Sequence, residues 1–536
     1  MSTLSRHVTS PVVGLIATCV LGFVVPASAT DPGLSTPRVR VPPAGQHGFP
    51  YGSSSLDLAA LGYSEQEYLI SGTARAFIPT APLQANGRWS VKPNPGITAP
   101  YTTRIIVRRP INPRRFSGTV VVEWDNASGL ADTHSDWYYM HEEIVRQGYV
   151  YVGVTTQHAS VQTVTAWESG SASRYASLFH PGDSYDYDIF SQAGWITTHP
   201  RNGDPRPLGD LTDRVRAVIA TGFSQSAAWL TTYVNAIHRL NPVYAGFLIH
   251  DHGSDGPLSL DVADWATGDP IPGNVPVTPF IDTPYPMQLR TDQNVPVLVT
   301  LSEFGLSDFG TAAARTFHLQ PDSAHIRVWE FTGAPHIDAG FVKDVTADDV
   351  KTYGSSTVDP CDGPPGIGTI VTAQGTRASL TALSRWANGA EAPRRAPRMS
   401  LVVPNPPDSF EELVTFNRDP ATGIAIGGIR LPAVAVPTAT LNGNRSDLDE
   451  LTWGPGGQCY LVGAYDRWNH DSDLWDGQAG LDPSPTPEPD LQVLYPSHQN
   501  YVERVAAASL QSVKDGYLRP ADGVNLVLDA AHAAVP

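Results

Sequence analysis

Residues 221–230 read TGFSQSAAWL and set a glycine, a bulky residue and a serine between an apolar run and a helix-forming stretch. A nucleophile on a sharp strand-to-helix turn needs small residues two positions before and two after it, because larger side chains clash there. Gly222 and Ser226 hold these positions around Ser224, although a second glycine is usual where Ser226 stands. The stretch therefore predicts a nucleophile at Ser224. The alternative is that Ser224 or Ser226 only caps the following helix, since serine is a favoured N-cap.

The sequence around this stretch alternates short β-branched runs with amphipathic segments, which is typical of strands and helices that cross over a parallel sheet. Several runs are apolar at consecutive positions, as in Val120-Val121-Val122, so both faces of the sheet should be buried. The pattern predicts an α/β fold with a mostly parallel central sheet covered by helices. The expected strands are 104–108, 119–124, 149–155, 217–221, 245–249, 295–301 and 326–331.

Two further side chains follow expected strands in the order serine, acid, histidine, which is the chain order of the partners of a nucleophilic serine on this kind of turn. Glu303 follows the strand at 295–301, and Asp308 in the same loop is the competing acid. His336 follows the strand at 326–331, and its imidazole can accept the serine proton and return it to a leaving group. His325 is the rival base, but it precedes that strand and should lie at the opposite edge of the sheet.

An oxyanion formed by serine attack needs two hydrogen-bond donors. The first should be the backbone N–H of Gln225, directly after the nucleophile. The second is expected from the loop after the strand at 119–124, where Asn126 or Ala127 could donate. The alternative for this loop is an ordinary polar turn.

The N-terminus predicts export from the cell. A short apolar run ends in Ala27-Ser28-Ala29, so we read 1–29 as a signal peptide. A membrane anchor is the weaker alternative, because the run is shorter than the ~20 apolar residues of a spanning helix. Cleavage would remove Cys19 and leave Cys361 and Cys459, which we expect to form a disulfide in an oxidising compartment. Two separate buried thiols are the alternative.

The rest of the chain divides into three regions by composition. Residues 30–345 hold the expected hydrolase core, and 346–492 are rich in proline and glycine and predict an irregular lid or side region. Residues 493–536 regain helical periodicity and should form C-terminal helices that pack on the core. The formal net charge of −18 among 536 residues argues against nucleic acid or an anionic membrane surface as a partner.

With these residues in hand, the chain resembles a group of large secreted bacterial and fungal α/β-hydrolase domain proteins. The resemblance rests on the stretches VVVEWDNASG, YVYVGVTTQ, SYDYDIFSQAG, TGFSQSAAWLTTYVNAIH, YAGFLIHDHG, FTGAPHID and YPSHQNYVERV. It implies a Gly-x-Ser-Gln-Ser elbow, with Ser224 as nucleophile, His336 as base and Glu303 as acid. The corresponding stretch here reads Ser302-Glu303-Phe304-Gly305 and lacks the aspartate that follows the glutamate in the group, which favours Glu303 but leaves Asp308 as a possible substitute. The resemblance implies no cofactor.

Two histidines follow the expected strand at 245–249. His250 and His252 could lie on one side of an extended strand, but without a third clustered ligand they do not predict a metal site. His250 is instead expected to line the substrate pocket.

Together these features predict a secreted serine hydrolase that cleaves carboxylic esters of unknown size through an acyl-enzyme. A serine peptidase or amidase with the same triad is one alternative, and a non-catalytic binding protein on a hydrolase scaffold is another. Oligomeric state is left open.

Overall fold

The computed structural model describes residues 33–251, 288–307, 317–356, 370–402, 415–443, 459–468 and 489–536. The expected signal peptide at 1–29 and Cys361 lie outside these ranges, so cleavage and the bridge to Cys459 stay predictions. Within the same ranges, no helix combines the length and the apolar character needed to cross a lipid bilayer.

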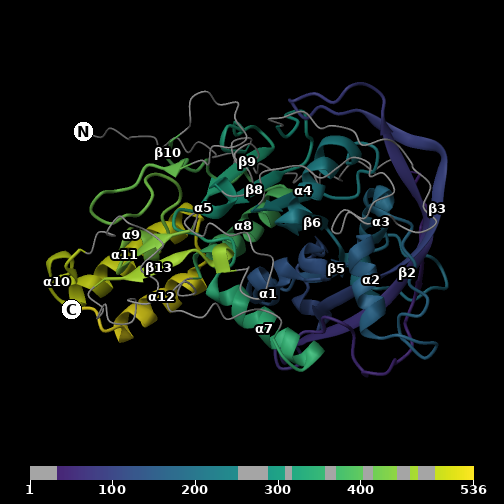
Figure 1. Ribbon diagram of the computed structural model, residues 1–536, viewed down its shortest axis with the longest axis horizontal. Helices are drawn as coiled ribbons and strands as arrows, with labels where there is room; N and C mark the ends of the chain where they lie inside the picture. Colours follow the sequence, from purple (N-terminus) through teal and green to yellow (C-terminus); the bar gives the residue numbers. More distant parts are fainter. Residues whose placement is uncertain are drawn as a thin grey trace, which may run out of the picture.

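Nine of the described strands form one sheet, in the order β1-β2-β3-β5-β4-β6-β7-β8-β9 (Figure 1). From β5 through β4 to β9 all neighbours pair in parallel, whereas β1, β2, β3 and β5 pair antiparallel. All seven expected strands are present, so the prediction of a mostly parallel sheet is confirmed. The strand bounds are β1 Arg38–Arg40, β2 Tyr63–Pro79, β3 Val91–Pro110, β4 Thr119–Trp124, β5 Val150–Val154, β6 Ala217–Phe223, β7 Gly246–His250, β8 Val297–Leu301 and β9 Ile326–Glu330.

Both faces of this sheet are covered by helices. Along β4, Val120 and Val122 pack into one hydrophobic core and Val121 packs into the other, because successive side chains of a strand point to opposite faces. The helices that close the first core are α3 (Asp186–Trp195) and α4 (Gln225–Thr232), which η5 (Tyr233–Ile237) extends. Those that close the second are α1 (Ser135–Gln147), α7 (Ala339–Tyr353) and α8 (Val371–Ala387).

The remaining short elements connect the strands. They are α2 (His158–Trp167), α5 (Glu303–Ser307), η1 (Pro113–Arg115), η2 (Ser128–Leu130), η3 (Asp183–Tyr185) and η4 (Gly209–Arg214).

The long hairpin of β2 and β3 is the feature that the sequence did not predict beyond 104–108. It runs along one side of the molecule in Figure 1, at the purple end of the colour bar. The first half of β3 contains Pro93, Pro95 and Pro100, which interrupt the alternation expected of a strand. These prolines lie outside the pairing with β5, which involves residues 105–108 of β3. Proline is tolerated at these positions, because its missing backbone N–H is not needed for pairing with β5.

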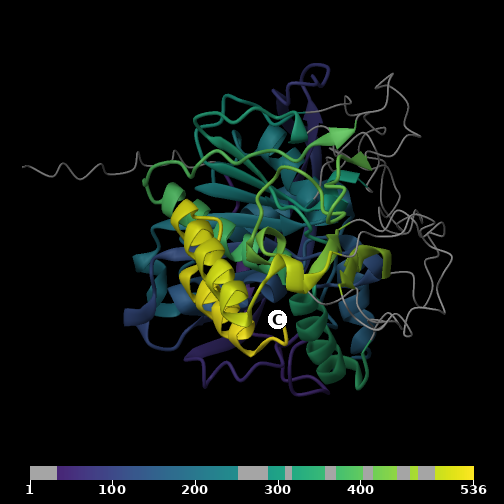
Figure 2. The same cartoon turned by 90° about the vertical axis from the view of Figure 1, so that its left-hand side faces the viewer.

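The C-terminal region is only partly the lid or side region expected at 346–492. Helix α8 falls inside those residues, yet Leu380 and Leu383 pack into the same core as the sheet. The boundary at 345 therefore does not separate core from lid. Two small sheets and the last helices complete the region, and α11 and α12 lie side by side in yellow in Figure 2. The bounds are β10 Leu401–Val402, β11 Thr415–Phe416, α9 Pro432–Ala435, β12 Ala439–Asn442, η6 Cys459–Val462, β13 Ala464–Arg467, α10 Leu491–Leu494, α11 His498–Asp515 and α12 Pro520–His532.

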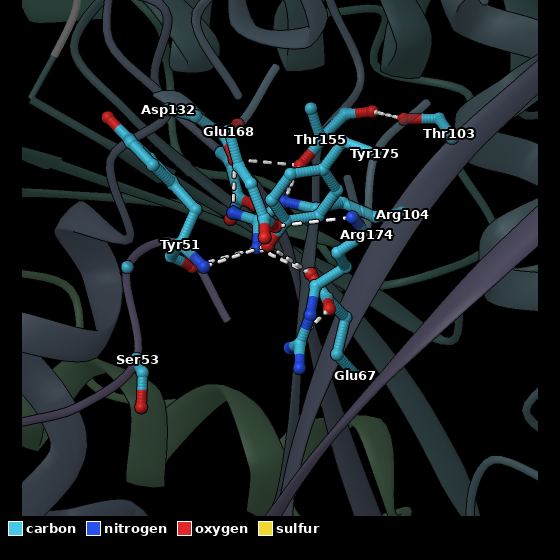
Figure 3. Close-up of polar contacts among 12 residues, drawn as sticks. Tyr51, Ser53, Glu67, Thr103, Arg104, Asp132, Thr155, Glu168, Arg174 and Tyr175 are labelled. Atoms are coloured by element: carbon cyan, nitrogen blue, oxygen red, sulfur yellow. Dashed lines mark hydrogen bonds and ion pairs between the residues drawn. The ribbon is translucent and has the colours of Figure 1, made fainter. Parts of the chain in front are cut away.

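A network of buried charges fastens β2 and β3 to the loops beside them (Figure 3). Arg104 on β3 donates to Glu67 on β2 at 3.1 Å and to Asp132 at 2.5 Å. Arg174 and Tyr175 donate to the same Glu67 carboxylate at 3.0 and 2.9 Å. The side chains of Glu67, Arg104 and Asp132 are at most 1% exposed. Each charge must therefore keep its partners, because an unpaired charge at this depth is very unfavourable.

Replacing Glu67 by glutamine should test how much this network stabilises the fold. The change Glu67→Gln leaves the buried Arg104 and Arg174 without their shared anion, which should lower the free energy of unfolding by about 3 to 5 kcal/mol. Urea unfolding measures this loss. The control Asp213→Asn breaks an ion pair with Arg206 whose side chains are 78% and 41% exposed, and it should cost at most about 1 kcal/mol. Equal losses for the two variants would contradict a stabilising role for the network.

Candidate active site

Ser224 lies in the sharp turn between β6 and α4. Strand β6 ends at Phe223 and α4 begins at Gln225, so one residue makes the reversal. That residue has a φ of 56°, a backbone conformation that a side chain with a Cβ rarely adopts. Among the described contacts, the Ser224 side chain makes no hydrogen bond that caps the helix. The alternative of a simple helix cap is therefore not what the structure shows.

Gly222 is needed because the chain folds closely back on itself at this turn. A Cβ at Gly222 would lie 2.9 Å from the carbonyl oxygen of Ser226, closer than such atoms approach. Ser226 itself is fully buried and fits the position where a second glycine is usual. The predicted strand-turn-helix arrangement is thus present with serine in place of that glycine.

His336 reaches Ser224 from the loop after β9, as the sequence predicts. Its Nε2 lies 3.0 Å from Ser224 Oγ. The ring stacks on Phe223 with the two centroids 4.5 Å apart, and its backbone carbonyl accepts a hydrogen bond from Tyr139 Oη at 2.5 Å. Only 2% of His336 is exposed. Because its ring and its backbone are both held, the imidazole is fixed in the orientation that faces the serine.

The acid beside His336 is Asp251, and the assignment of Glu303 to this position is wrong. Asp251 Oδ2 lies 2.6 Å from His336 Nδ1. Asp251 follows the last residue of β7, the strand next to β6, and β6 pairs Phe223 with His250 in parallel register. Ser224 and Asp251 are therefore equivalent positions on adjacent strands, one residue beyond that pair. Like Ser224, Asp251 has a positive φ, of 55°.

Asp251 is held as an anion by several donors. Ser302 donates to it twice, from its backbone N–H at 2.6 Å and from its hydroxyl at 2.7 Å. Burial alone would raise the pKa of Asp251, but the hydrogen bond to His336, the charges of His336 and His250, and the Ser302 N–H outweigh it. The pKa therefore lies below the usual range of an aspartate. An ionised Asp251 fixes which nitrogen of His336 carries the proton.

Glu303 lies close by but joins a different set of groups. Its carboxylate accepts hydrogen bonds from the backbone N–H groups of Gly333 and Gly443 at 2.7 and 3.0 Å, and from Arg418 at 3.2 Å. It thereby connects the loop that carries His336 to the C-terminal region. Asp308, the competing acid, lies outside the described residues.

The expected oxyanion donors are narrowed from three to two. Gln225 provides the first N–H of α4, a position where no carbonyl of the same helix is available. The N–H of Asn126 already donates to Thr133 O at 2.9 Å, so Asn126 is not the second donor. Ala127, which is fully buried in the same loop, keeps that candidacy.

His250 does not line a pocket as expected, because both of its ring nitrogens face partners in the core. Nδ1 lies 2.7 Å from Asp136 Oδ1, and Nε2 lies 3.0 Å from Thr376 Oγ1. The residue is 1% exposed and packs between Phe223 and Tyr139. Its side chain is therefore part of the packed core next to Phe223. His252 lies outside the described residues.

One group within the described ranges brings metal-binding atoms together. Ligand atoms of His180, Asp183 and Asp186 all lie within 4.8 Å of one another. However, His180 Nε2 lies 2.7 Å from the carbonyl oxygen of Thr156, and Nδ1 accepts from the Gly182 N–H at 3.2 Å. A carbonyl only accepts, so Nε2 carries the proton and both nitrogens are engaged. The imidazole therefore fits a structural role in this loop better than metal binding, because a metal ligand needs an unprotonated ring nitrogen that accepts no other hydrogen bond.

The missed residue, Asp251, carried a signal in the sequence. It follows an expected strand directly, within the stretch YAGFLIHDHG, and still lies between the serine and the histidine in chain order. Carboxyl ends of parallel strands gather functional groups, so 245–249 was as good a source of the acid as 295–301. The structure distinguishes the two, because Asp251 lies at His336 Nδ1 whereas Glu303 accepts from the backbone N–H of Gly333.

Comparisons with known proteins identify the family of this chain. A comparison with curated protein sequences finds no match. Among solved structures, a variant of the esterase rPPE is 14% identical, with a TM-score of 0.30 over 57% of this chain and 85% of that one. A serine hydrolase without a lid from Xanthomonas campestris is 13% identical, with a TM-score of 0.24 over 47% and 88% of the two chains. A family profile described as "Alpha/beta hydrolase domain" matches residues 35–528. The chain therefore belongs to the alpha/beta hydrolase domain family.

Proposed function

We propose that this protein is a serine hydrolase that cleaves carboxylic esters through an acyl-enzyme. The observation that carries the proposal is the continuous chain of hydrogen-bond distances from Ser224 Oγ to His336 Nε2, at 3.0 Å, and from His336 Nδ1 to Asp251 Oδ2, at 2.6 Å. A serine hydroxyl is a weak nucleophile unless a neighbouring base takes its proton. The distances from Ser224 to His336 and from His336 to Asp251 support these two residues as base and orienting acid.

The proposed reaction has two halves. In the first, His336 accepts the proton of Ser224 while Oγ attacks the ester carbonyl, and the N–H groups of Gln225 and Ala127 bind the oxyanion. The intermediate then expels the alcohol, which takes the proton from His336, and leaves an acyl group on Ser224. In the second half, His336 activates water, which releases the carboxylic acid and restores the serine. Ionised Asp251 stabilises the imidazolium in both halves.

We further propose that the protein acts outside the cell. The support is the expected signal peptide at 1–29 and the pair Cys361 and Cys459 that would remain after its removal.

Reactivity of Ser224 tests the proposal directly. A fluorophosphonate probe should label the purified protein on the peptide that contains Ser224, as read by mass spectrometry, and Ser224→Ala should abolish the label. The labelled enzyme should also lose hydrolysis of nitrophenyl esters. A series of esters of increasing chain length identifies the preferred acyl group. Peptide and anilide substrates show whether the enzyme also cleaves amides. An unlabelled serine, or faster cleavage of the peptides, would contradict an ester hydrolase.

The identity of the acid gives a second prediction. Asp251→Asn removes the charge that orients His336, so kcat/KM for a nitrophenyl ester should fall by about 10⁴-fold. Glu303→Gln should retain most of kcat, because the Glu303 carboxylate accepts from the backbone N–H of Gly333 in the histidine loop. It should instead lower the free energy of unfolding, since it leaves the charge of Arg418 without its anion. Steady-state kinetics and urea unfolding of both variants check this. Loss of kcat in Glu303→Gln with wild-type kcat in Asp251→Asn would return the role to Glu303.

A further inference from the structure

Ser226 does more than fill the place of a glycine. Its side chain is fully buried, and its Oγ lies 3.3 Å from the backbone carbonyl oxygen of Asp125. A carbonyl oxygen can only accept, so the serine hydroxyl donates. This hydrogen bond joins the first turn of the helix behind the nucleophile to the loop that holds Ala127, the candidate second oxyanion donor. Glycine or alanine would fit the same space but could not make the bond.

A second bond joins the same loop to the other side of the nucleophile. Asn126 Nδ2 donates to the carbonyl of Phe223, the residue before Ser224, at 2.8 Å. Asn126 Oδ1 accepts from the N–H of Ser128 at 2.8 Å, which fixes the side chain and the turn around Ala127. The residues on both sides of Ser224 are therefore attached to the residues directly before Ala127.

The far end of the loop is fixed independently of the nucleophile. Asn126 and Thr133 exchange backbone hydrogen bonds of 2.9 and 3.0 Å across the base of the loop. Asp132 accepts from Arg104 and from Thr155, in the charge network drawn in Figure 3. His134 Nδ1 lies 3.0 Å from Asp125 Oδ1. Burial lowers the pKa of His134 to about 3, so the ring is neutral at neutral pH.

These contacts connect the loop of the candidate oxyanion donor Ala127 to the turn that carries Ser224. The loop is anchored at its far end to Arg104 on β3 and to Thr155 after β5, and at its near end Asp125 donates its N–H to Val154 on β5. The bonds from Ser226 and Asn126 then tie Asp125 and Asn126 directly to the residues around Ser224. We infer that Ser226 is a positioning residue whose hydroxyl aligns the Ala127 N–H with the oxyanion. The inference rests on the proposed function. Alignment matters because a donor stabilises the transition state only when it already points at the developing charge.

The variants for the test separate the hydroxyl from the packing. Ser226→Ala removes the hydroxyl and keeps most of the volume, Ser226→Gly restores the usual glycine, and Ser226→Thr keeps a hydroxyl. The control Ser379→Ala removes an equally buried hydroxyl that donates to the carbonyl of Gly375 at 2.8 Å in α8, away from the nucleophile. All are compared by ester kinetics, by fluorophosphonate labelling rate, and by inhibition with a trifluoromethyl ketone, which forms an oxyanion on the serine.

The inference predicts that Ser226→Ala and Ser226→Gly both lower kcat by about 10- to 100-fold with KM unchanged, because outright loss of an oxyanion donor costs about 10²- to 10³-fold. The labelling rate should fall and the inhibition constant of the ketone should rise by the same factor. Ser226→Thr should regain kcat, and Ser379→Ala should keep it.

Wild-type kcat and wild-type ketone inhibition in both Ser226→Ala and Ser226→Gly would overturn the positioning role and leave the proposed function intact. A wild-type protein that neither reacts with the probe nor hydrolyses esters would overturn the proposed function, and the positioning role with it.

Discussion

The site depends on the parallel pairing of β6 with β7. That pairing sets Phe223 opposite His250, and the N–H of Ser224 donates to the His250 carbonyl at 2.9 Å. The next residue on each strand, Ser224 on β6 and Asp251 on β7, is then within hydrogen-bond distance of His336. Both leave their strands with a positive φ, so both side chains turn out of the sheet at the same edge. His336 needs only to reach across from the loop after β9 to meet the two.

Ser224 and Asp251 can keep their strained backbone conformations because both are buried and the polar groups around them are hydrogen-bonded. Ser302 holds Asp251 with two hydrogen bonds, and Glu303, the next residue, holds the histidine loop through Gly333. Strained conformations persist only where neighbouring structure determines them strongly. The buried charges of Arg104 and Glu67 help in the same way to fix the loop that follows β4. Preorganisation of the site thus involves residues from β2 to the C-terminal region.

Agreement between sequence and structure is best where a local pattern has one physical solution. The apolar runs of β4 and β6 favour buried strands, and small residues on both sides of a serine that precedes a helix favour a tight turn. The hairpin of β2 and β3 was missed because its prolines obscure the alternation, and α8 was assigned to a lid because proline and glycine dominate the sequence around it. Both elements take their form from what they pack against.

The sequence by itself determined the strands of the parallel sheet, the turn at Ser224 and the histidine at 336, because each follows from the chemistry of a few consecutive residues. Only the tertiary structure decided between Asp251 and Glu303. Both acids follow a buried strand, and nothing local to either says which strand lies beside β6. Tertiary structure likewise gave Ser226 and Asn126 their contacts, since each bonds to a carbonyl about 100 residues away in the chain. Strand order, which is set by packing over the whole sheet, supplied the difference.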